Sequence, residues 1–303
     1  MSIVLTEAQA PTSWLNRVQY PFESRFADVS GGRMHYIDVG QGDPIVFLHG
    51  LPGWSFQYRH LIRGLSNGYR CIAPDLLGFG MSDKPANLTY SPLNYTENLR
   101  ELIEHLGLDR FTLVMHDFGC PIGLGYAVEN PSRVRKAVVF NGFCWNLEHE
   151  RLPPRVAKLA MSPAGRWAMV NRNPWAKWLR TLFVDRGAFG DTFVSGMMGP
   201  ISNPDDRVGL WNVAKSLIRS GPYFDDVWLR RKELSVHPIM LIWGMKDPLY
   251  GEKALNKWWH EFPLSEVCRL PSVGHFPMEE KPAEVLRVLR EFVSAPVQKG
   301  FVS

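Results

Sequence analysis

Three residues whose side chains can take part in hydrolysis, Asp117, Asp247 and His275, each come shortly after a stretch that predicts a buried β-strand. The carboxyl ends of parallel strands meet at one edge of a sheet, so we expect these side chains to lie close together. A histidine that an acid orients is held in the tautomer that a general base needs. Each residue alone has a structural interpretation, because Asp247-Pro248 favours a turn and the chain contains 9 histidines. Their joint placement favours a catalytic group.

The stretch from Phe111 to Gly123 predicts a carboxylate at a sharp turn between a strand and a helix. Phe111–Met115 is an apolar run that predicts a buried strand, and Pro121 is favoured in the first turn of the next helix. Unpaired N–H groups and the helix dipole at such a position stabilise an ionised carboxylate. We therefore predict that Asp117 attacks an electrophile directly. The alternative is that Asp117 only caps the helix.

Strand signals alternate with helical signals along the chain, which is typical of a mostly parallel sheet with helices on both faces. Strands are predicted at Arg33–Val39, Pro44–Leu48, Tyr69–Pro74, Val134–Phe140, Pro238–Trp243 and Glu266–Leu270, and helices at Asn94–Leu106 and Pro282–Val293. Along such a chain, the order of nucleophile, acid and histidine is that of the α/β-hydrolase fold. The sequence therefore predicts an α/β protein of this fold.

The strand pattern stops between residues 142 and 235, a segment rich in Trp, Arg and Pro. Within it, Trp175, Trp178 and Leu182 are spaced to share one face of a helix. We expect this segment to be a helical cap that lies over the edge of the sheet. Residues 1–141 and 236–303 would then form the two parts of the α/β-hydrolase core.

Composition limits the classes of partner. The net charge is only +4 and the basic residues are scattered, which argues against a nucleic-acid surface. The cysteines Cys71, Cys120, Cys144 and Cys268 form neither a CxxC pair nor a cluster with ligand spacing, so we expect reduced thiols and no metal site. The sequence shows neither a signal-peptide pattern nor an apolar stretch long enough to span a bilayer, so we expect a cytoplasmic protein without a membrane partner. The oligomeric state is not predicted.

Two other nucleophiles are weaker candidates. Gly64-Leu65-Ser66-Asn67-Gly68 matches the G-x-S-x-G pattern, but it follows a predicted helix and precedes a strand. A nucleophile elbow has the opposite arrangement, so Ser66 is interpreted as a turn residue. Cys120 lies three residues past Asp117 and is expected to point into the helix.

Five segments of the chain resemble the haloalkane dehalogenases and the neighbouring epoxide hydrolases of the α/β-hydrolase superfamily. The resemblance spans roughly Tyr20 to Val293 and is looser in the cap. The segments are His49-Gly50-Leu51-Pro52, Asp75-Leu76-Leu77-Gly78-Phe79-Gly80-Met81-Ser82-Asp83-Lys84-Pro85, His116-Asp117-Phe118-Gly119, Trp243-Gly244-Met245-Lys246-Asp247 and Gly274-His275-Phe276.

The resemblance implies a reaction in two steps. Asp117 would be the nucleophile, which expels a leaving group and forms an alkyl ester, and His275, paired with Asp247, would activate water to hydrolyse that ester. The backbone N–H groups of Leu51 and Phe118 would form the oxyanion hole. This chemistry needs neither a metal nor an organic cofactor.

The leaving group is less clear, because this sequence departs from the dehalogenase pattern at two positions. The resemblance implies that dehalogenases hold the halide with a Trp directly after the nucleophile and an Asn or Glu after the His-Gly, whereas this chain has Phe118 and Leu51. Two missing donors would cost roughly 3–6 kcal/mol, or about 10² to 10⁴ in rate. A cap tryptophan could supply a replacement N–H group. The candidates are Trp145, Trp167, Trp175, Trp178, Trp211 and Trp228.

Three alternatives remain open. Epoxide hydrolases use a pair of cap tyrosines, but Tyr223 is the one tyrosine between residues 142 and 235. The β-lactone decarboxylases also resemble the chain, and a catalytically silent binding protein on the same fold is a further alternative. In each case the apolar residues Leu51 and Phe118 and the Trp-rich cap predict a small hydrophobic substrate or ligand.

Overall fold

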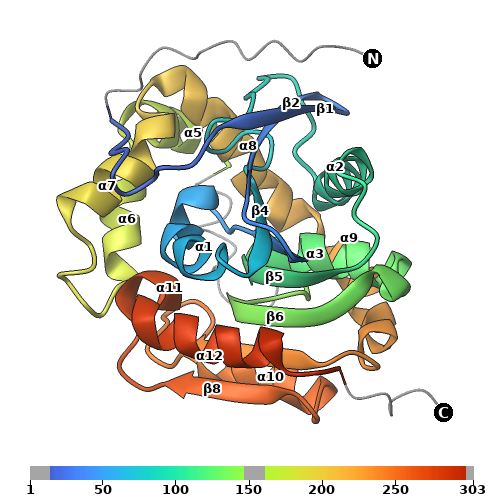
Figure 1. The fold of residues 1–303 in the computed structure, drawn as a ribbon. Coiled ribbons are helices and arrows are strands. Elements are labelled where there is room, and N and C mark those ends of the chain that lie inside the picture. The colour runs from blue at the N-terminus through green and yellow to red at the C-terminus, as the bar shows by residue number, and fades with distance from the viewer. Residues whose placement is uncertain (1–13, 147–160, 298–303) are drawn as a thin grey trace.

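A computed structural model describes residues 14–146 and 161–297 of the 303-residue chain (Figure 1). Its eight-stranded sheet has the order β1-β2-β4-β3-β5-β6-β7-β8. The strands are β1 (Arg25–Val29), β2 (Gly32–Val39), β3 (Asp43–Leu48), β4 (Tyr69–Pro74), β5 (Phe111–Asp117), β6 (Val134–Gly142), β7 (Ile239–Gly244) and β8 (Glu266–Leu270). The strands from β3 to β8 pair in parallel, whereas β2 runs antiparallel to both β1 and β4. The predicted α/β-hydrolase fold is confirmed.

Helices cover both faces of the sheet. On one face α1 (Arg59–Leu65) packs against α12 (Pro282–Ser294), and on the other α2 (Pro92–His105) packs against α3 (Gly119–Glu129). The sequence of α12 explains its packing, because its buried residues Val285, Leu289, Phe292 and Val293 recur at helical spacing. Two further helices, α10 (Glu252–Glu261) and α11 (Pro277–Glu280), follow β7 and β8.

The central strand β5 is buried along its whole length. It lies between β3 and β6, with Leu48 opposite Met115 and Phe140 opposite His116. The strand continues two residues beyond the predicted end at Met115, so Asp117 is its last residue. This extension holds the carboxylate on the rigid sheet rather than in a free loop.

A helical segment connects β6 to β7. It contains α5 (Pro163–Asn171), α6 (Trp175–Thr181), α7 (Asp191–Met198), α8 (Pro204–Arg219) and α9 (Gly221–Leu229), with short 3₁₀ helices at Gly199–Ile201 and Arg230–Leu234. In Figure 1, α5, α6 and α7 lie along one side of the sheet. The Trp54 indole donates a hydrogen bond to the Gly196 carbonyl (3.0 Å), which fixes α7 against the loop after β3. Trp175, the first residue of α6, and Leu182, which directly follows that helix, are buried, whereas Trp178 is partly buried.

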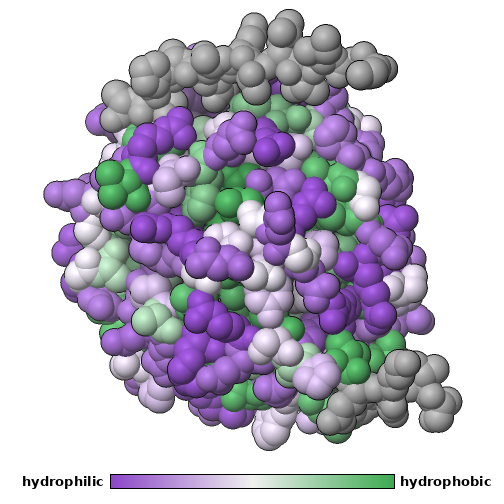
Figure 2. Space-filling model, viewed as in Figure 1, coloured by the Kyte–Doolittle hydropathy of each residue, from purple (hydrophilic) through white to green (hydrophobic). Residues whose placement is uncertain are grey.

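The surface drawn in Figure 2 is mostly hydrophilic, and hydrophobic residues occur in small groups between hydrophilic ones. Within residues 14–146 and 161–297, no helix is both long and apolar enough to cross a membrane. The apolar side chains gather instead in one core on both sides of the sheet.

Candidate active site

Asp117 stands at the turn from β5 into α3. Its φ of 48° lies in the left-handed region, which residues other than glycine rarely adopt. Gly50, in the loop after β3, allows the backbone to approach this side chain, since a Cβ at position 50 would clash with the Cβ of Asp117. The carboxylate is therefore held between the loop after β3 and the start of α3.

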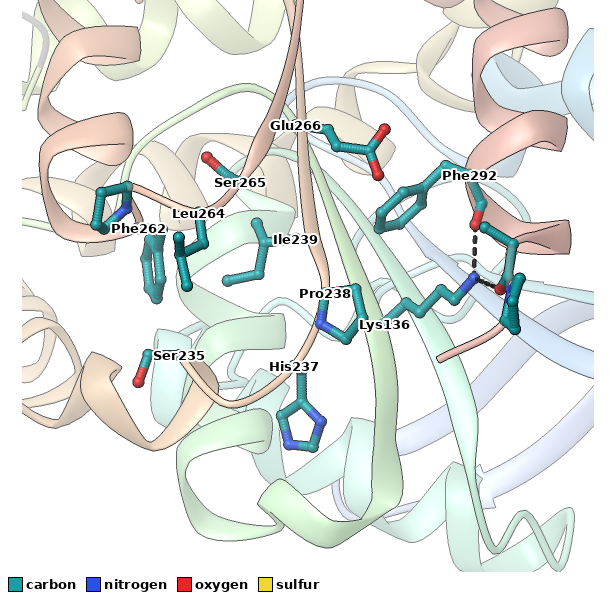
Figure 3. Close-up of a pocket in the computed structure, with 13 residues that line it drawn as sticks. Lys136, Ser235, His237, Pro238, Ile239, Phe262, Leu264, Ser265, Glu266 and Phe292 are labelled. Carbon is teal, nitrogen blue, oxygen red and sulfur yellow. Dashed lines mark hydrogen bonds between the residues drawn. The ribbon is translucent and has the colours of Figure 1, made fainter. Parts of the chain in front are cut away.

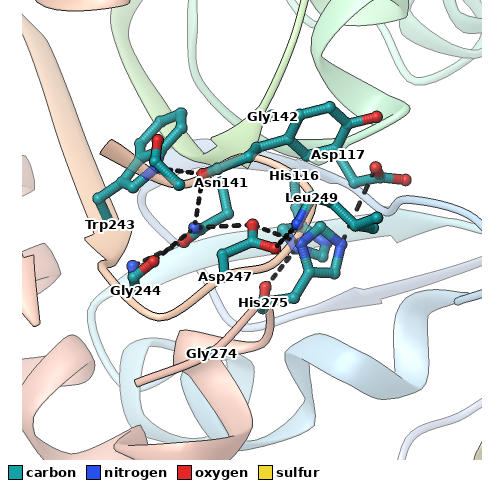
Figure 4. Close-up of polar contacts among 12 residues, drawn as sticks. His116, Asp117, Asn141, Gly142, Trp243, Gly244, Asp247, Leu249, Gly274 and His275 are labelled. Atoms are coloured by element: carbon teal, nitrogen blue, oxygen red, sulfur yellow. Dashed lines mark hydrogen bonds and ion pairs between the residues drawn. The ribbon is translucent and has the colours of Figure 1, made fainter. Parts of the chain in front are cut away.

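The two carboxylate oxygens of Asp117 have different surroundings. Oδ2 accepts a hydrogen bond from the Leu51 backbone N–H at 2.9 Å. Oδ1 lies 3.9 Å from Nε2 of His275, which has no hydrogen-bond partner among the residues that the structure describes (Figure 4). One oxygen is thus fixed by the backbone, and the other faces a buried imidazole nitrogen that is free to bind a substrate atom or a water.

Asp247 orients the imidazole from the other side. Its Oδ2 lies 2.8 Å from Nδ1 of His275 and 2.9 Å from the amide nitrogen of Asn141 at the end of β6. Its Oδ1 accepts a hydrogen bond from the Leu249 backbone N–H at 2.7 Å. An ionised carboxylate can only accept a hydrogen bond, so Nδ1 of His275 carries the proton that it donates to Asp247. Nε2 is then the basic nitrogen.

The pKa shifts agree with these contacts. Burial alone would raise the pKa of Asp247, but His275 and the backbone N–H groups of Leu249 and Tyr250 hold it below its usual value. Burial would lower the pKa of His275, yet the charges of Asp247 and Asp117 raise it overall. Burial raises the pKa of Asp117, against the effect of His275 and the Leu51 and Phe118 N–H groups.

The backbone of His275 is also held from two directions. Its N–H donates to the Leu182 carbonyl (2.9 Å) at the end of α6. Its carbonyl lies 2.9 Å from Nε2 of His116, and the other nitrogen of His116 lies 3.1 Å from the amide nitrogen of Gln57. An amide nitrogen only donates, so Nδ1 of His116 accepts and Nε2 donates to His275.

The side chains of Leu51 and Phe118 cannot donate hydrogen bonds. The ring of Phe118 is fully buried and packs edge-on against Tyr95 at 5.5 Å. The polar contribution of these two residues is limited to their backbone N–H groups, which both favour the charged form of Asp117. The departure from the dehalogenase pattern therefore leaves apolar side chains beside the carboxylate.

The tryptophans of the helical segment have different surroundings. The Trp175 indole N–H is buried without a hydrogen-bond partner in the described part of the chain. Trp167 is 55% exposed, Lys257 lies 4.1 Å over the ring of Trp145, and Arg231 lies over that of Trp228. Among the tryptophans in the described part of this segment, Trp175 is thus the one whose N–H is found buried without a partner.

Tyr223 is used in packing. Its hydroxyl lies 2.7 Å from Oγ1 of Thr96 and 3.5 Å from the Pro121 carbonyl, and burial raises the pKa of the phenol. A Cβ at Gly125, within α3, would clash with this hydroxyl, so the phenol lies along α3. This placement gives no support to an acid role of the epoxide hydrolase kind.

The two weaker nucleophile candidates lie elsewhere. Ser66 follows α1 and precedes β4, which agrees with its interpretation as a turn residue. Cys120 is fully buried within α3, and burial raises the pKa of its thiol well above the usual value. Neither residue combines an exposed strand-to-helix turn with a nearby base.

A cavity of about 490 Å³ lies at the opposite edge of the sheet from Asp117 (Figure 3). Ile239 and Glu266, at the amino ends of β7 and β8, line it, and Lys136 on its wall donates to the Phe292 carbonyl. Asp247 and His275 follow the carboxyl ends of these strands. This cavity is therefore not the space in front of the Asp117 carboxylate.

The analysis of the sequence missed the contacts of Asn141, which also bonds to both the carbonyl and the N–H of Gly244. A polar residue at the end of a buried strand, Phe140-Asn141-Gly142, is the signal that could have found it. His116 and Gln57 were missed as well, because their contact joins β5 to a 3₁₀ helix (Ser55–Tyr58) that is distant in sequence.

Comparison with known proteins agrees with the fold. The alpha/beta hydrolase fold family matches residues 43–282. Haloalkane dehalogenase 2 of Mycobacterium tuberculosis is 33% identical over 276 residues, which is 90% of this chain and 95% of the relative. A cis-3-alkyl-4-alkyloxetan-2-one decarboxylase of Shewanella oneidensis is 27% identical and covers 90% of this chain and 89% of its own.

Solved structures include the haloalkane dehalogenase DatA from Agrobacterium tumefaciens, with a TM-score of 0.76, 25% identity and coverage of 90% of this chain and 96% of that one. A mutant of DbjA has a TM-score of 0.75 at 22% identity, and the match covers 90% of this chain and 98% of that chain. At this identity the match supports only the fold. The fold and its matching residues thus define an α/β hydrolase. Within that class, the chain belongs to the haloalkane dehalogenase-like family of enzymes.

Proposed function

We propose that this hydrolase acts through an ester on Asp117, with His275 as the general base and Asp247 as the acid partner of that base. The observation that carries the proposal is the position of His275 relative to the two oxygens of Asp117. Nε2 of His275 faces Oδ1 of Asp117 at 3.9 Å, while the Leu51 N–H holds Oδ2. The arrangement gives each atom a separate role.

In the first step, Oδ1 attacks the electrophilic carbon, the bond to the leaving group breaks, and the leaving group takes the bonding electrons. Oδ2 becomes the carbonyl oxygen of the ester and stays beside the Leu51 and Phe118 N–H groups. In the second step, Nε2 of His275 takes a proton from water, and the hydroxide attacks the ester carbonyl. The tetrahedral intermediate collapses, the alcohol leaves with a proton, and the Asp117 carboxylate returns.

We assign residues 142–235 the role of a cap over this site, with the core formed by residues 1–141 and 236–303. The contact of α7 with Trp54 and the hydrogen bond from His275 to Leu182 support this role. A cap with buried tryptophans and the apolar side chains of Leu51 and Phe118 favour a small hydrophobic substrate.

Halide is the first candidate for the leaving group, because the relatives that match 90% of the chain include a haloalkane dehalogenase at 33% identity. Expulsion of an anion in an apolar pocket requires a hydrogen-bond donor. The Trp175 N–H, which has no hydrogen-bond partner among the described residues, is the donor that we assign to the halide.

Decarboxylation of a β-lactone is the second candidate, and the apolar side chains at positions 51 and 118 favour it. An oxetan-2-one is a β-lactone, and relatives of that activity match 90% of the chain. In this strained ring the leaving oxygen stays attached to the substrate, so the reaction needs no halide site. Epoxide hydrolysis and a silent binding role are outcomes of the test below.

The test incubates the purified protein with 1-bromohexane, 1,2-epoxyhexane and a cis-3,4-dialkyloxetan-2-one, and measures bromide, diol and alkene. Release of bromide is the expected result, and alkene or diol alone would reassign the reaction. Asp117→Ala should abolish turnover, whereas Asp109→Ala, at an exposed position, should leave it unchanged. A protein that binds one of these compounds equally well with and without Asp117, and turns over none, would be a binding protein.

A further inference from the structure

Glu280, the last residue of α11, accepts hydrogen bonds from two parts of the chain. Its Oε1 accepts from the Gly274 N–H at 2.8 Å, directly before His275. Its Oε2 accepts from the N–H groups of Val184 and Asp185, at 2.9 and 2.7 Å, just after α6. The carboxylate is 5% exposed, so these bonds are largely protected from water.

We call residues 182–185 the strap and residues 274–276 the histidine loop. The strap and the loop also touch directly, through the hydrogen bond from the His275 N–H to the Leu182 carbonyl and through the stacked rings of Phe183 and Phe276, 5.1 Å apart. A side chain at Gly274 would clash with the Leu182 carbonyl, which shows how closely the two segments pack.

From these contacts we propose that Glu280 is a positioning residue for the general base, and that it sets the place of His275 by tying the histidine loop to the strap of the helical segment. The inference rests on the proposed two-step function. Glu280 does not touch the reacting atoms. It acts through the backbone of Gly274 and, by way of the strap, through the backbone N–H of His275. A carboxylate suits this role because three converging N–H groups stabilise its negative charge.

The two steps of the reaction separate a positioning role from a merely structural one. Attack by Asp117 does not use His275, whereas hydrolysis of the ester depends on the place of Nε2. Displacement of a catalytic group by about 1 Å can cost about 100-fold in rate. Loss of Glu280 should therefore slow hydrolysis and leave formation of the ester unchanged.

The experiment compares Glu280→Gln with Glu279→Gln. Glu279 is its neighbour on the same short helix and equally buried, but it pairs with Arg59 and not with the histidine loop. A glutamine at 280 keeps the shape of the side chain but turns an NH₂ group toward N–H donors. The His275→Ala variant lacks the general base and should retain the ester, so the probe is the one of 1-bromohexane, 1,2-epoxyhexane and the cis-3,4-dialkyloxetan-2-one that adds mass to this variant. Single-turnover reactions with that probe are quenched and followed by intact-protein mass.

Glu280→Gln should form the ester within about 2-fold of the wild-type rate and hydrolyse it about 10- to 100-fold more slowly. Glu279→Gln should lower the melting temperature but change both steps alike, and Glu280→Asp should recover part of the hydrolysis rate. If Glu279→Gln does not fold, Glu261→Gln replaces it as the control. Glu261 is the last residue of α10 and forms an ion pair with Arg231. Equal rates for Glu280→Gln and wild type, or equal losses in both steps, would overturn the proposal.

Hydrogen exchange supplies a second readout that does not depend on turnover. Glu280→Gln should increase exchange in both the strap and the histidine loop, whereas the control should not. Unchanged exchange in either segment would overturn the proposal that Glu280 links the strap to the histidine loop. If none of the three probes labels His275→Ala, the proposed function fails and the role of Glu280 in hydrolysis falls with it, a result distinct from an altered ratio of the two steps.

Discussion

Nε2 of His275 and Oδ1 of Asp117 lie 3.9 Å apart, too far for a direct hydrogen bond, although both groups are buried. A buried basic nitrogen without a partner in the described residues has a cost in stability, which is common where a site binds a reactant. The opposite nitrogen is fixed by Asp247 at 2.8 Å, so the imidazole cannot turn to satisfy both atoms. In the proposed second step, a water would bind to this nitrogen beside the Asp117 ester.

A lower pH should slow hydrolysis of the proposed ester more than its formation. Hydrolysis needs neutral His275, whose pKa is raised above 6.5 by Asp247 and Asp117 against the effect of burial. Formation of the ester removes the charge of Asp117, which lowers the pKa of His275 and frees the base. As the pH falls from about 8 to about 5.5, the protonated fraction rises, and the ester should accumulate in the wild-type enzyme. Rapid quenching and mass measurement would show this; an ester fraction that is flat or declines toward acid would contradict it.

Asn141→Ala should weaken the orientation of Asp247. The variant removes the amide that donates to Asp247 Oδ2 and accepts from the Gly244 N–H, so buried polar groups lose their partners. We expect a loss of about 1–3 kcal/mol in the free energy of unfolding and slower ester hydrolysis. Urea denaturation and single-turnover kinetics measure the two effects. Asn130→Ala, at a partly buried residue after α3, is the control, and loss of hydrolysis there too would show that the effect is not specific.

Trp175→Phe should identify the donor to a halide. Loss of one hydrogen bond to a charged group costs about 1.5–3 kcal/mol, or about 10- to 100-fold in the rate of ester formation from a bromoalkane. The control is Trp178→Phe, since its ring packs edge-on against Trp175 in the same helix. The rate with a β-lactone should not change. Equal rates for both variants with the bromoalkane would exclude Trp175 as the donor.

Gly50→Ala should disrupt the site through a steric clash with Asp117. Overpacking of this kind costs about 1–3 kcal/mol in stability, and we expect most of the activity to be lost with it. Gly68→Ala is the matched control, because nothing lies within 4 Å of a Cβ there. Gly68 also belongs to the G-x-S-x-G segment, so loss of activity in the control would revive Ser66 as a candidate.

The strands that carry the candidate triad could be predicted because β5, β7 and β8 are short apolar or alternating runs bounded by turn residues. Pro and Gly marked the turns, and the order of Asp117, Asp247 and His275 gave the class. The extension of β5 to Asp117 was not predicted. In the sequence the apolar run stops at the polar residue His116, but in the structure the strand pairing continues as far as Asp117 and Gly142.

Contacts between distant segments could not be predicted. Helical periodicity indicates that Trp175 and Leu182 share a face, but it does not say which part of the core that face meets. The hydrogen bonds of Glu280 to the strap and the histidine loop, and the burial of the Trp175 N–H without a partner among the described residues, depend on how the helical segment docks on the sheet. That docking is decided by shape and packing over many residues rather than by local pattern.

The most direct test of the central claim is the mass of His275→Ala after exposure to 1-bromohexane, 1,2-epoxyhexane and a cis-3,4-dialkyloxetan-2-one in separate reactions. Without its base, the variant should retain the ester, and digestion should locate the added mass on the peptide that contains Asp117. The control His260→Ala, at an exposed position on α10, should turn over normally and retain no adduct. An adduct on any other residue, or full turnover by His275→Ala without an ester, would contradict the account.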